Sequence, residues 1–265
     1  RDRTKNERKR MNKILHGDCI EHLKRMSTST VDLVFTDPPY NIGYEYDDYD
    51  DNLEPEKYLD LCRIWIGECH RVLKPTGSFW LAISDEYVSE IDILCKNIGF
   101  KRKSWIIWYY TFGVNCRKNF SRSHTHLLYY VKNSKIHTFN SESIGVPSAR
   151  QLVYNDKRAA GLRLPDNTWI LRPQEIEAFT DLEDTWHFPR VCGTYKERIP
   201  GSANQLPEKL CERVILVSSN QNDVVLDPFG GTGTIAYVAK KLKRQYITIE
   251  LSLKWVEVIR KRLAV

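Results

Sequence analysis

The sequence lacks the cysteine and histidine spacing of a metal site or a disulfide framework. Its seven cysteines are scattered along the chain, with no Cys-x-x-Cys pair and no partnered His-x3-His. Such spacing argues against a zinc site and against disulfide cross-links, and it suggests a reducing compartment. We therefore expect no bound metal and a cytoplasmic location.

Long apolar runs are also missing. The longest candidate, residues 105–114, is short and is interrupted by Thr111 and Gly113, so we expect no membrane span. The basic N-terminus lacks the apolar core of a signal peptide. A chain of 265 residues, 42% hydrophobic and 28% charged, is sufficient for one large soluble domain with an inserted lobe. Because the sequence starts at Arg1, either Met11 approximates a natural start or the chain belongs to something longer.

Acidic residues are absent from one long stretch and crowded into another. Residues 101–141 contain eight Lys or Arg, nine aromatic residues and no Asp or Glu, whereas residues 44–60 contain eight acidic residues against Lys57 alone. The first stretch suits a polyanion. The second would repel one unless it points elsewhere or moves.

Apolar periodicity predicts strands that alternate with helices. Strands are predicted at residues 13–16, 31–36, 77–83, 104–111, 126–131, 224–226 and 246–249. Helices are predicted from the turn after residue 16 to Met26, at 56–73, from an N-cap at Ser84 to about Gly99, and at 207–218, 232–242 and 253–263. This alternation predicts an α/β fold with a mostly parallel sheet covered on both faces. Between residues 140 and 200 five prolines interrupt the pattern, and we interpret this segment as an inserted lobe.

A glycine-rich turn follows the strand predicted at 224–226. It reads Asp227-Pro228-Phe229-Gly230-Gly231-Thr232-Gly233-Thr234. Glycines allow positive φ and close approach of a ligand, and the N-terminus of the following helix offers N–H groups to an anion. Glu250, at the end of the next strand, is placed to hold ribose hydroxyls. The spacing is neither Gly-x-Gly-x-x-Gly nor a P-loop, which disfavours NAD and ATP and favours S-adenosylmethionine; a purely structural turn stays open.

A second motif, Asp37-Pro38-Pro39-Tyr40, follows the strand predicted at 31–36. The prolines fix the backbone, so the Asp37 carboxylate and the carbonyl before Pro38 form a rigid pair of acceptors. Two acceptors on a ring amino group localise electron density on its nitrogen and orient it toward a sulfonium methyl. Tyr40 offers a face on which a flipped-out base can stack. Alone, the tetrapeptide is equally a stiff turn with a capping Asp.

The order of these motifs resembles the β-class DNA amino-methyltransferases, the family that includes the cell-cycle-regulated adenine methyltransferase. There the catalytic motif comes first, a target-recognition region follows and the cofactor motif comes last; the resemblance spans residues 12–263. It implies a Rossmann-like, S-adenosylmethionine-dependent methyltransferase fold that is circularly permuted. The chain then divides into a basic lead-in (1–12), a catalytic half (13–139), a target-recognition region (140–200) and a cofactor-binding half (201–265).

The resemblance also implies site residues. The predicted catalytic residues are Asp37, Pro38, Pro39 and Tyr40. The predicted cofactor-binding residues are Asp18, Cys19, Asp37, Gln205, Leu206, Asp227, Phe229, Gly230, Gly231, Thr232, Gly233, Thr234 and Glu250. Leu206 departs from relatives that carry Lys there, and Ser202 from those that carry His. The first departure puts in doubt a charged contact to the cofactor's carboxylate.

Residues 113–126 resemble the loop that approaches DNA beside the target base. The predicted DNA contacts are Arg117, Lys118, Asn119, Arg122 and His124. Of the alternating His124 and His126, we expect one simply to face solvent. Candidates for reading base edges are Arg150, Lys157, Arg158, Arg163, Arg172 and Arg190. Trp105 and Trp108 are expected in the core, and the acidic segment 44–56 is expected to be a mobile active-site loop, poorly ordered without DNA.

The leading hypothesis is methylation of adenine N6 in double-stranded DNA, because relatives with Asp first in the tetrapeptide mostly act on adenine. Methylation of cytosine N4 is the rival, and a DNA-binding module without catalysis is the alternative from another class. RNA and protein glutamine are less favoured substrates. The resemblance leaves open a homodimer and a restriction enzyme that acts on the same site. It implies a nucleoid-associated protein in the cytoplasm, or a nuclear one in a eukaryote.

Overall fold

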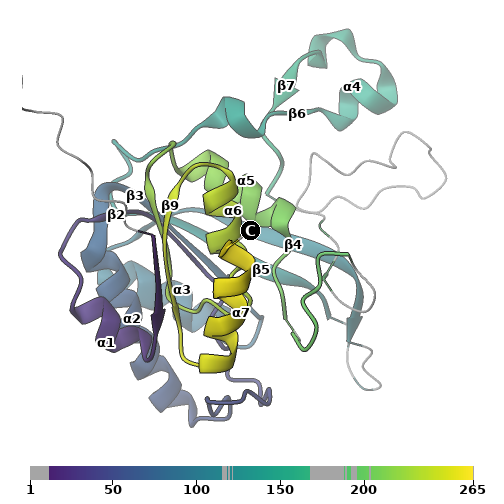
Figure 1. The fold of residues 1–265 in the computed structure, drawn as a ribbon. Coiled ribbons are helices and arrows are strands. Elements are labelled where there is room, and N and C mark those ends of the chain that lie inside the picture. Colours follow the sequence, from purple (N-terminus) through teal and green to yellow (C-terminus); the bar gives the residue numbers. More distant parts are fainter. Residues whose placement is uncertain are drawn as a thin grey trace, which may run out of the picture.

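The computed structural model describes residues 12–114, 118, 120, 122–167, 188, 190–191, 196–202 and 204–264. A seven-stranded sheet forms the centre of the molecule (Figure 1), in the order β1-β9-β8-β2-β3-β5-β4. The strands are β1 (Lys13–His16), β2 (Val31–Thr36), β3 (Leu73–Ile83), β4 (Lys101–Val114), β5 (Arg122–Val131), β8 (Val224–Asp227) and β9 (Gln245–Glu250).

Five neighbouring strands, from β1 to β3, are parallel, and β5 is antiparallel to both β3 and β4. The connection after β2 leads to β3 on one side, whereas the connection after β8 leads to β9 on the other. β2 and β8 are therefore adjacent strands at which the winding direction reverses. Ligands of open α/β sheets bind outside the carboxyl ends of such strands.

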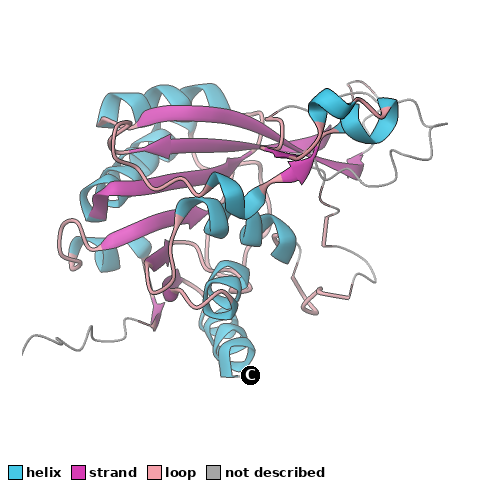
Figure 2. Cartoon of the chain, turned by 90° about the horizontal axis from the view of Figure 1, so that it is seen from above, coloured by secondary structure: helices cyan, strands magenta, loops and turns pink. Residues whose placement is uncertain are grey.

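Two groups of helices cover the two faces of the sheet (Figure 2). One group is α1 (Cys19–Lys24), α2 (Pro55–Val72) and α3 (Val88–Ile98); the other is α5 (Glu208–Ser218), α6 (Thr234–Lys241) and α7 (Leu253–Ala264). Alternation along the strands feeds both cores: Val34 of β2 packs with the first group, and its neighbours Leu33 and Phe35 pack with the second. The predicted α/β fold with a mostly parallel, doubly covered sheet is confirmed.

Local details differ from the sequence-based expectations. Ser84 is not the N-cap of α3, because the helix begins at Val88 and Tyr87 occupies the N-cap position. The helix ends at Gly99 as expected, with φ 121°. β3 starts at Leu73, earlier than predicted, because α2 passes directly into the strand.

A small lobe leaves the sheet after β5 and is drawn away from it in Figure 1. It contains the 3-10 helices Ser141–Ile144 and Lys157–Ala159, the hairpin β6 (Val146–Pro147) and β7 (Leu162–Arg163), and α4 (Ala149–Tyr154). Arg150 and Arg158 pair with Asp156. Arg172 and the rest of 168–187 lie outside the described residues, as does most of the predicted lead-in. No helix in the described part of the chain is long and apolar enough to cross a bilayer.

Candidate active site

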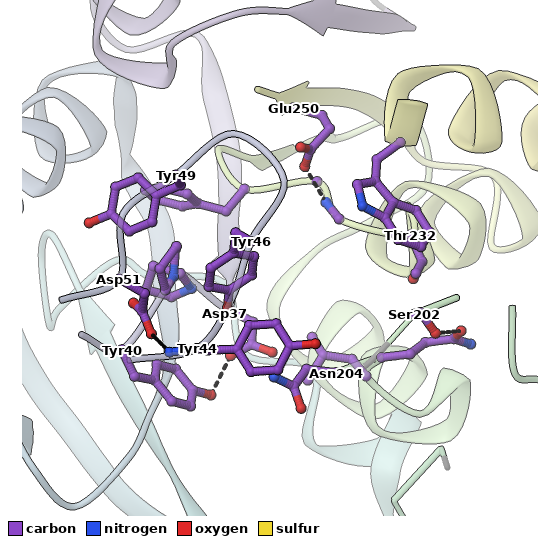
Figure 3. A pocket seen from close by; sticks show the side chains of 18 of the residues that line it. Asp37, Tyr40, Tyr44, Tyr46, Tyr49, Asp51, Ser202, Asn204, Thr232 and Glu250 are labelled. Carbon is purple, nitrogen blue, oxygen red and sulfur yellow. Dashed lines mark hydrogen bonds between the residues drawn. The ribbon is translucent and has the colours of Figure 1, made fainter. Parts of the chain in front are cut away.

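One cavity of about 440 Å³ lies where the chain leaves β2 and β8, within the size range of small-molecule sites. All four residues of the Asp37–Tyr40 motif line it, and so does every predicted cofactor residue except Gly233. In Figure 3, Glu250 and Thr232 occupy one side of this pocket, and Asp37 and Tyr40 the other. The switch point thus brings together two motifs that are almost 190 residues apart in sequence.

Asp37 is positioned by its neighbours in the tetrapeptide. The Tyr40 hydroxyl donates a hydrogen bond to the Asp37 carboxylate (Figure 3), and the Tyr58 hydroxyl of α2 donates to the Pro39 carbonyl at 3.0 Å. Burial raises the pKa of Asp37 to about 6, although the bond from Tyr40 opposes the rise. At neutral pH the carboxylate is mostly ionised, held in place and ready to accept a second hydrogen bond.

The acidic loop after the tetrapeptide folds over the pocket. Asp51, only 2% exposed, accepts hydrogen bonds from the backbone N–H groups of Asn41, Ile42 and Tyr44 at 2.7–3.1 Å. At the far side of the loop, Asp47 forms an ion pair with Lys254 of α7 at 2.8 Å. A buried carboxylate thus organises the backbone at the start of this segment, and its poor order without DNA stays a prediction.

The tyrosines of this loop form an aromatic cluster that the sequence reasoning missed. The ring centroids of Tyr44 and Tyr46 lie 4.8 Å apart and those of Tyr46 and Tyr49 6.2 Å apart, and all three line the pocket. Their i, i+2 and i, i+3 spacing beside the motif was the available signal. Burial and the charge of Asp37 raise the pKa of Tyr46, so its hydroxyl is neutral.

The glycine turn has the conformation that its sequence predicts. Gly231 and Gly233 adopt φ of 49° and 74°, in the left-handed region that favours glycine. At Gly230 a Cβ would stand 2.5 Å from Thr248 Oγ1 of β9. The turn is therefore pressed against the neighbouring strand, and only glycine fits at its start.

Glu250 closes the cofactor side of the pocket. Its carboxylate accepts hydrogen bonds from the backbone N–H groups of Gly231 at 2.7 Å and Ser252 at 2.8 Å. Each oxygen retains a further lone pair for a ligand. The Gly17 N–H donates to the Glu250 carbonyl, which places Asp18 and Cys19 beside it. Asp18 also caps α1 by accepting from Glu21 N–H at 3.0 Å.

The predicted helix-opening motif forms a wall of the pocket. Gln205 is buried, and its amide donates to the Glu197 carbonyl at 2.7 Å and accepts from Ile199 N–H at 3.0 Å. Its hydrogen bonds thus hold the preceding loop. Leu206 adds an apolar surface from the core. Phe229 packs edge-on against Trp65, with ring centroids 5.1 Å apart.

Carboxyl groups, among them Asp37, Asp227 and Glu250, give the pocket an acidic character. Burial raises the pKa of Asp227 to about 8, and the charges of Glu250 and Asp37 add to this; burial likewise raises the pKa of Glu250. A nearby cation stabilises the ionised form of such buried carboxyl groups, so the site favours a cationic ligand over a phosphate-bearing one. A ligand with a sulfonium and an ammonium group fits this set of hydrogen-bond acceptors. Among the described residues no group of His, Cys, Asp and Glu side chains is arranged to hold a metal ion.

The wall beside Asp37 contains residues that sequence reasoning placed elsewhere. Trp108 is buried and donates to the Phe188 carbonyl at 2.8 Å, as expected of a core residue, yet it also lines the pocket with Tyr110. Arg190 lies over the Tyr110 ring, 5.3 Å from its centroid, and donates to Asn204 at 3.4 Å. The alternation of β4 was the signal that could have placed positions 108 and 110 on one face.

The predicted DNA-contact residues are only partly described. Arg122 and His124 line the pocket, and Arg122 pairs with Glu86 at 2.6 Å. Lys118 is exposed and does not line the pocket. Arg117 and Asn119 lie outside the described residues.

His126 is buried, and its Nδ1 accepts a hydrogen bond from Trp105 Nε1 at 2.9 Å. Burial and the nearby His124 lower the pKa of His126 to about 4, so it is neutral. The expectation that one histidine of the pair simply faces solvent is wrong, because His126 is buried and His124 lies at the pocket.

Comparison with known proteins identifies the family. A family model described as "DNA methylase" (N6_N4_Mtase) matches residues 31–261. The chain is 37% identical to the type II methyltransferase M.HpaI of Haemophilus parainfluenzae, over 95% of this chain and 74% of that protein. It is 35% identical to the DNA adenine methyltransferase YhdJ of Escherichia coli K12, over 95% and 82%.

Solved structures share the fold. The M1.HpyAVI–SAM complex covers 96% of this chain and all of that chain, with a TM-score of 0.63 and 24% identity. The cytosine-N4-specific PvuII DNA methyltransferase covers 95% and 86%, with a TM-score of 0.67 and 18% identity. The chain belongs to the N6_N4_Mtase family of DNA methylases.

Proposed function

We propose that this protein transfers a methyl group from S-adenosylmethionine to the N6 amino group of adenine in double-stranded DNA. The observation that carries the proposal is the shared pocket, in which Asp37 and Tyr40 face a glycine turn and two further carboxyl groups. When bound, S-adenosylmethionine supplies a methyl group on a positively charged sulfur.

The residues of the pocket have separable tasks. Gly230–Gly233, Asp227 and Glu250 hold the cofactor, and the two carboxyl groups favour its positive charge. Asp37 and the carbonyl before Pro38 accept the N–H bonds of the adenine amino group, and Tyr40 stacks on the base. With a pKa of about 6, Asp37 is a weak base at neutral pH. It acts as a positioned acceptor that directs the nitrogen lone pair at the methyl group.

Adenine is favoured over cytosine by the Asp that opens the tetrapeptide and by the likeness to YhdJ, a DNA adenine methyltransferase. The likeness to the cytosine-specific PvuII enzyme is one of fold, at 18% identity. A DNA-binding module without catalysis would not need the Asp37–Tyr40 contact or the acidic cofactor side. Methylation of cytosine N4 is therefore the alternative that the assay below distinguishes from methylation of adenine N6.

The finer assignments rest on the resemblance. Residues 140–200 would recognise the target sequence, and the order of the motifs would make the fold a circular permutation. Likenesses to type II methyltransferases support a restriction enzyme that acts on the same site. A homodimer and association with the nucleoid belong to the same set of proposals.

Expression of the protein in cells without adenine methylation, followed by modification-sensitive sequencing of their DNA, tests the proposal. We expect N6-methyladenine at one short sequence and none in cells that express Asp37→Ala. Modification of cytosine at that sequence would transfer the assignment to N4, and unmodified DNA despite soluble protein would refute both.

The rate should depend on the ionisation of Asp37. Because only the carboxylate accepts two hydrogen bonds, and its pKa is about 6, kcat/KM should fall about tenfold per pH unit below pH 6 and level off above it. Initial rates between pH 4.5 and 8 measure this profile. Tyr40→Phe removes the bond that lowers the pKa, so its inflection should move to higher pH. Identical inflections in the two proteins would contradict the role of Asp37.

Cofactor binding should release a proton. Asp227, with a pKa of about 8, is mostly protonated at pH 7, and a cationic ligand favours its ionised form. The affinity for S-adenosylmethionine should therefore rise as the pH increases toward 8. Calorimetry at pH 7 in two buffers of different ionisation enthalpy counts the released protons. Asp227→Asn should release far fewer protons than wild type. Equal proton release from both proteins would show that the proton comes from another group.

A further inference from the structure

One partly buried arginine outside the pocket contacts the glycine turn from behind. Arg262 lies in the last turn of α7, and its side chain is 11% exposed. Its Nη1 donates to the Thr232 carbonyl at 3.2 Å and to Thr234 Oγ1 at 2.9 Å. It does not line the cavity, so it touches the turn and not the space that a ligand would fill.

The other end of the guanidinium is fixed to two helices. Nη2 donates to Glu208 Oε1 at 2.9 Å, and Glu208 is the first residue of α5. The guanidinium carbon also lies 4.7 Å from the ring centroid of Tyr237 in α6. Arg262 therefore ties the turn to α5, α6 and α7 at once.

The turn needs such contacts because its glycine-rich backbone can adopt many conformations. Gly231 and Gly233 both adopt positive φ, and glycine loses more conformational freedom on ordering than any other residue. Ile259 of α7 packs under Gly233, but an apolar contact has no direction. Arg262 supplies directional bonds that select one arrangement of Thr232 and Thr234.

We infer that Arg262 is a positioning residue that holds the glycine turn in its cofactor-binding conformation. The inference rests on the proposed function, in which this turn binds S-adenosylmethionine. Without Arg262 the turn would populate other conformations, and the apparent Kd rises in inverse proportion to the competent fraction. The methyl-transfer step itself should be unaffected once the cofactor is bound.

Arg262→Gln tests this, with Arg260→Gln as the matched control. Arg260 lies on the same helix but is exposed and, among the described residues, pairs only with Glu257 of its own helix. We expect the calorimetric Kd for S-adenosylmethionine to rise by about tenfold or more in Arg262→Gln. KM for the cofactor should rise in parallel, while kcat at saturation and the Kd for DNA stay within about twofold. Without cofactor, hydrogen exchange of the backbone amides of residues 230–234 should be faster in Arg262→Gln than in wild type.

Two results would overturn the inference. One is a cofactor Kd equal to that of Arg260→Gln; the other is an equal loss of cofactor affinity, DNA affinity and kcat, which marks a general structural role. If Arg262→Gln does not fold, Glu208→Gln is the second test. This variant keeps the bonds from Arg262 to the turn, so we expect a smaller rise in the cofactor Kd. An unchanged cofactor Kd in Glu208→Gln would overturn the inference. A wild-type protein that does not bind S-adenosylmethionine would instead refute the proposed function.

Discussion

Asp37→Ala should abolish methyl transfer while leaving the affinity for S-adenosylmethionine within a few-fold of wild type. The carboxylate acts on the target amino group, and removal of one preorganised polar partner of a transition state lowers kcat on the order of a hundredfold to a thousandfold. Asp37 supplies both the charge and the geometry, so we expect the upper end or beyond. Single-turnover rates and calorimetric cofactor titrations measure the two quantities separately.

The thermal stability of Asp37→Ala distinguishes a catalytic role of Asp37 from a structural one. Burial raises the pKa of this carboxyl, which means that its ionised form is destabilised in the folded protein at neutral pH. Removal of the group should therefore leave Tm unchanged or higher, as is common where a site trades stability for activity. Asp37→Asn keeps the shape and should lose nearly as much activity. A large fall in Tm, or equal losses of rate and cofactor affinity, would mean that Asp37 is structural.

Gly230→Ala should weaken cofactor binding on the order of tenfold to a hundredfold, the range that corresponds to about 1–3 kcal/mol of overpacking. The new Cβ would stand 2.5 Å from Thr248 Oγ1 and 3.2 Å from the Ile249 carbonyl. Since Gly230 N–H also donates to that carbonyl at 2.7 Å, the turn can only yield by leaving β9. Cofactor titration measures the loss.

A second substitution separates this clash from general damage. Thr248 Oγ1 is buried and has no hydrogen-bond partner among the described residues, so Thr248→Ala makes room without breaking a bond. Gly230→Ala combined with Thr248→Ala should recover much of the affinity. Gly67→Ala in α2 is the control, because nothing lies within 4 Å of its added Cβ and alanine favours a helix. An unaffected Gly230→Ala would show that the turn does not set the cofactor site.

The sheet and the meeting of the two motifs could be predicted because both depend on local signals. Strands such as β2 can be recognised in the sequence as apolar runs that end near a proline. Parallel strands bring their carboxyl ends to one edge of the sheet. From this, Asp37 and Asp227 were expected together, and the structure places both in one pocket.

Other features depend on contacts distant in sequence and could not be predicted. The acidic composition of residues 44–60 indicated a segment that repels a polyanion, but it did not reveal that Asp51 turns inward and accepts hydrogen bonds from three backbone N–H groups. His126 is buried, and the hydrogen bond that it accepts comes from Trp105 on the neighbouring strand. Arg262 resembles any basic residue at the end of a helix until α5 and the glycine turn are placed beside it.

Methylation of adenine N6 by this pocket can be tested with the purified protein. The most direct measurement incubates the purified protein with radiolabelled S-adenosylmethionine and mixed-sequence DNA, digests the DNA to nucleosides and identifies the labelled one. We expect label in N6-methyladenine with wild type and none with Asp37→Ala. Label in N4-methylcytosine would contradict the assignment of the base, and DNA binding without label transfer would contradict the enzymatic role.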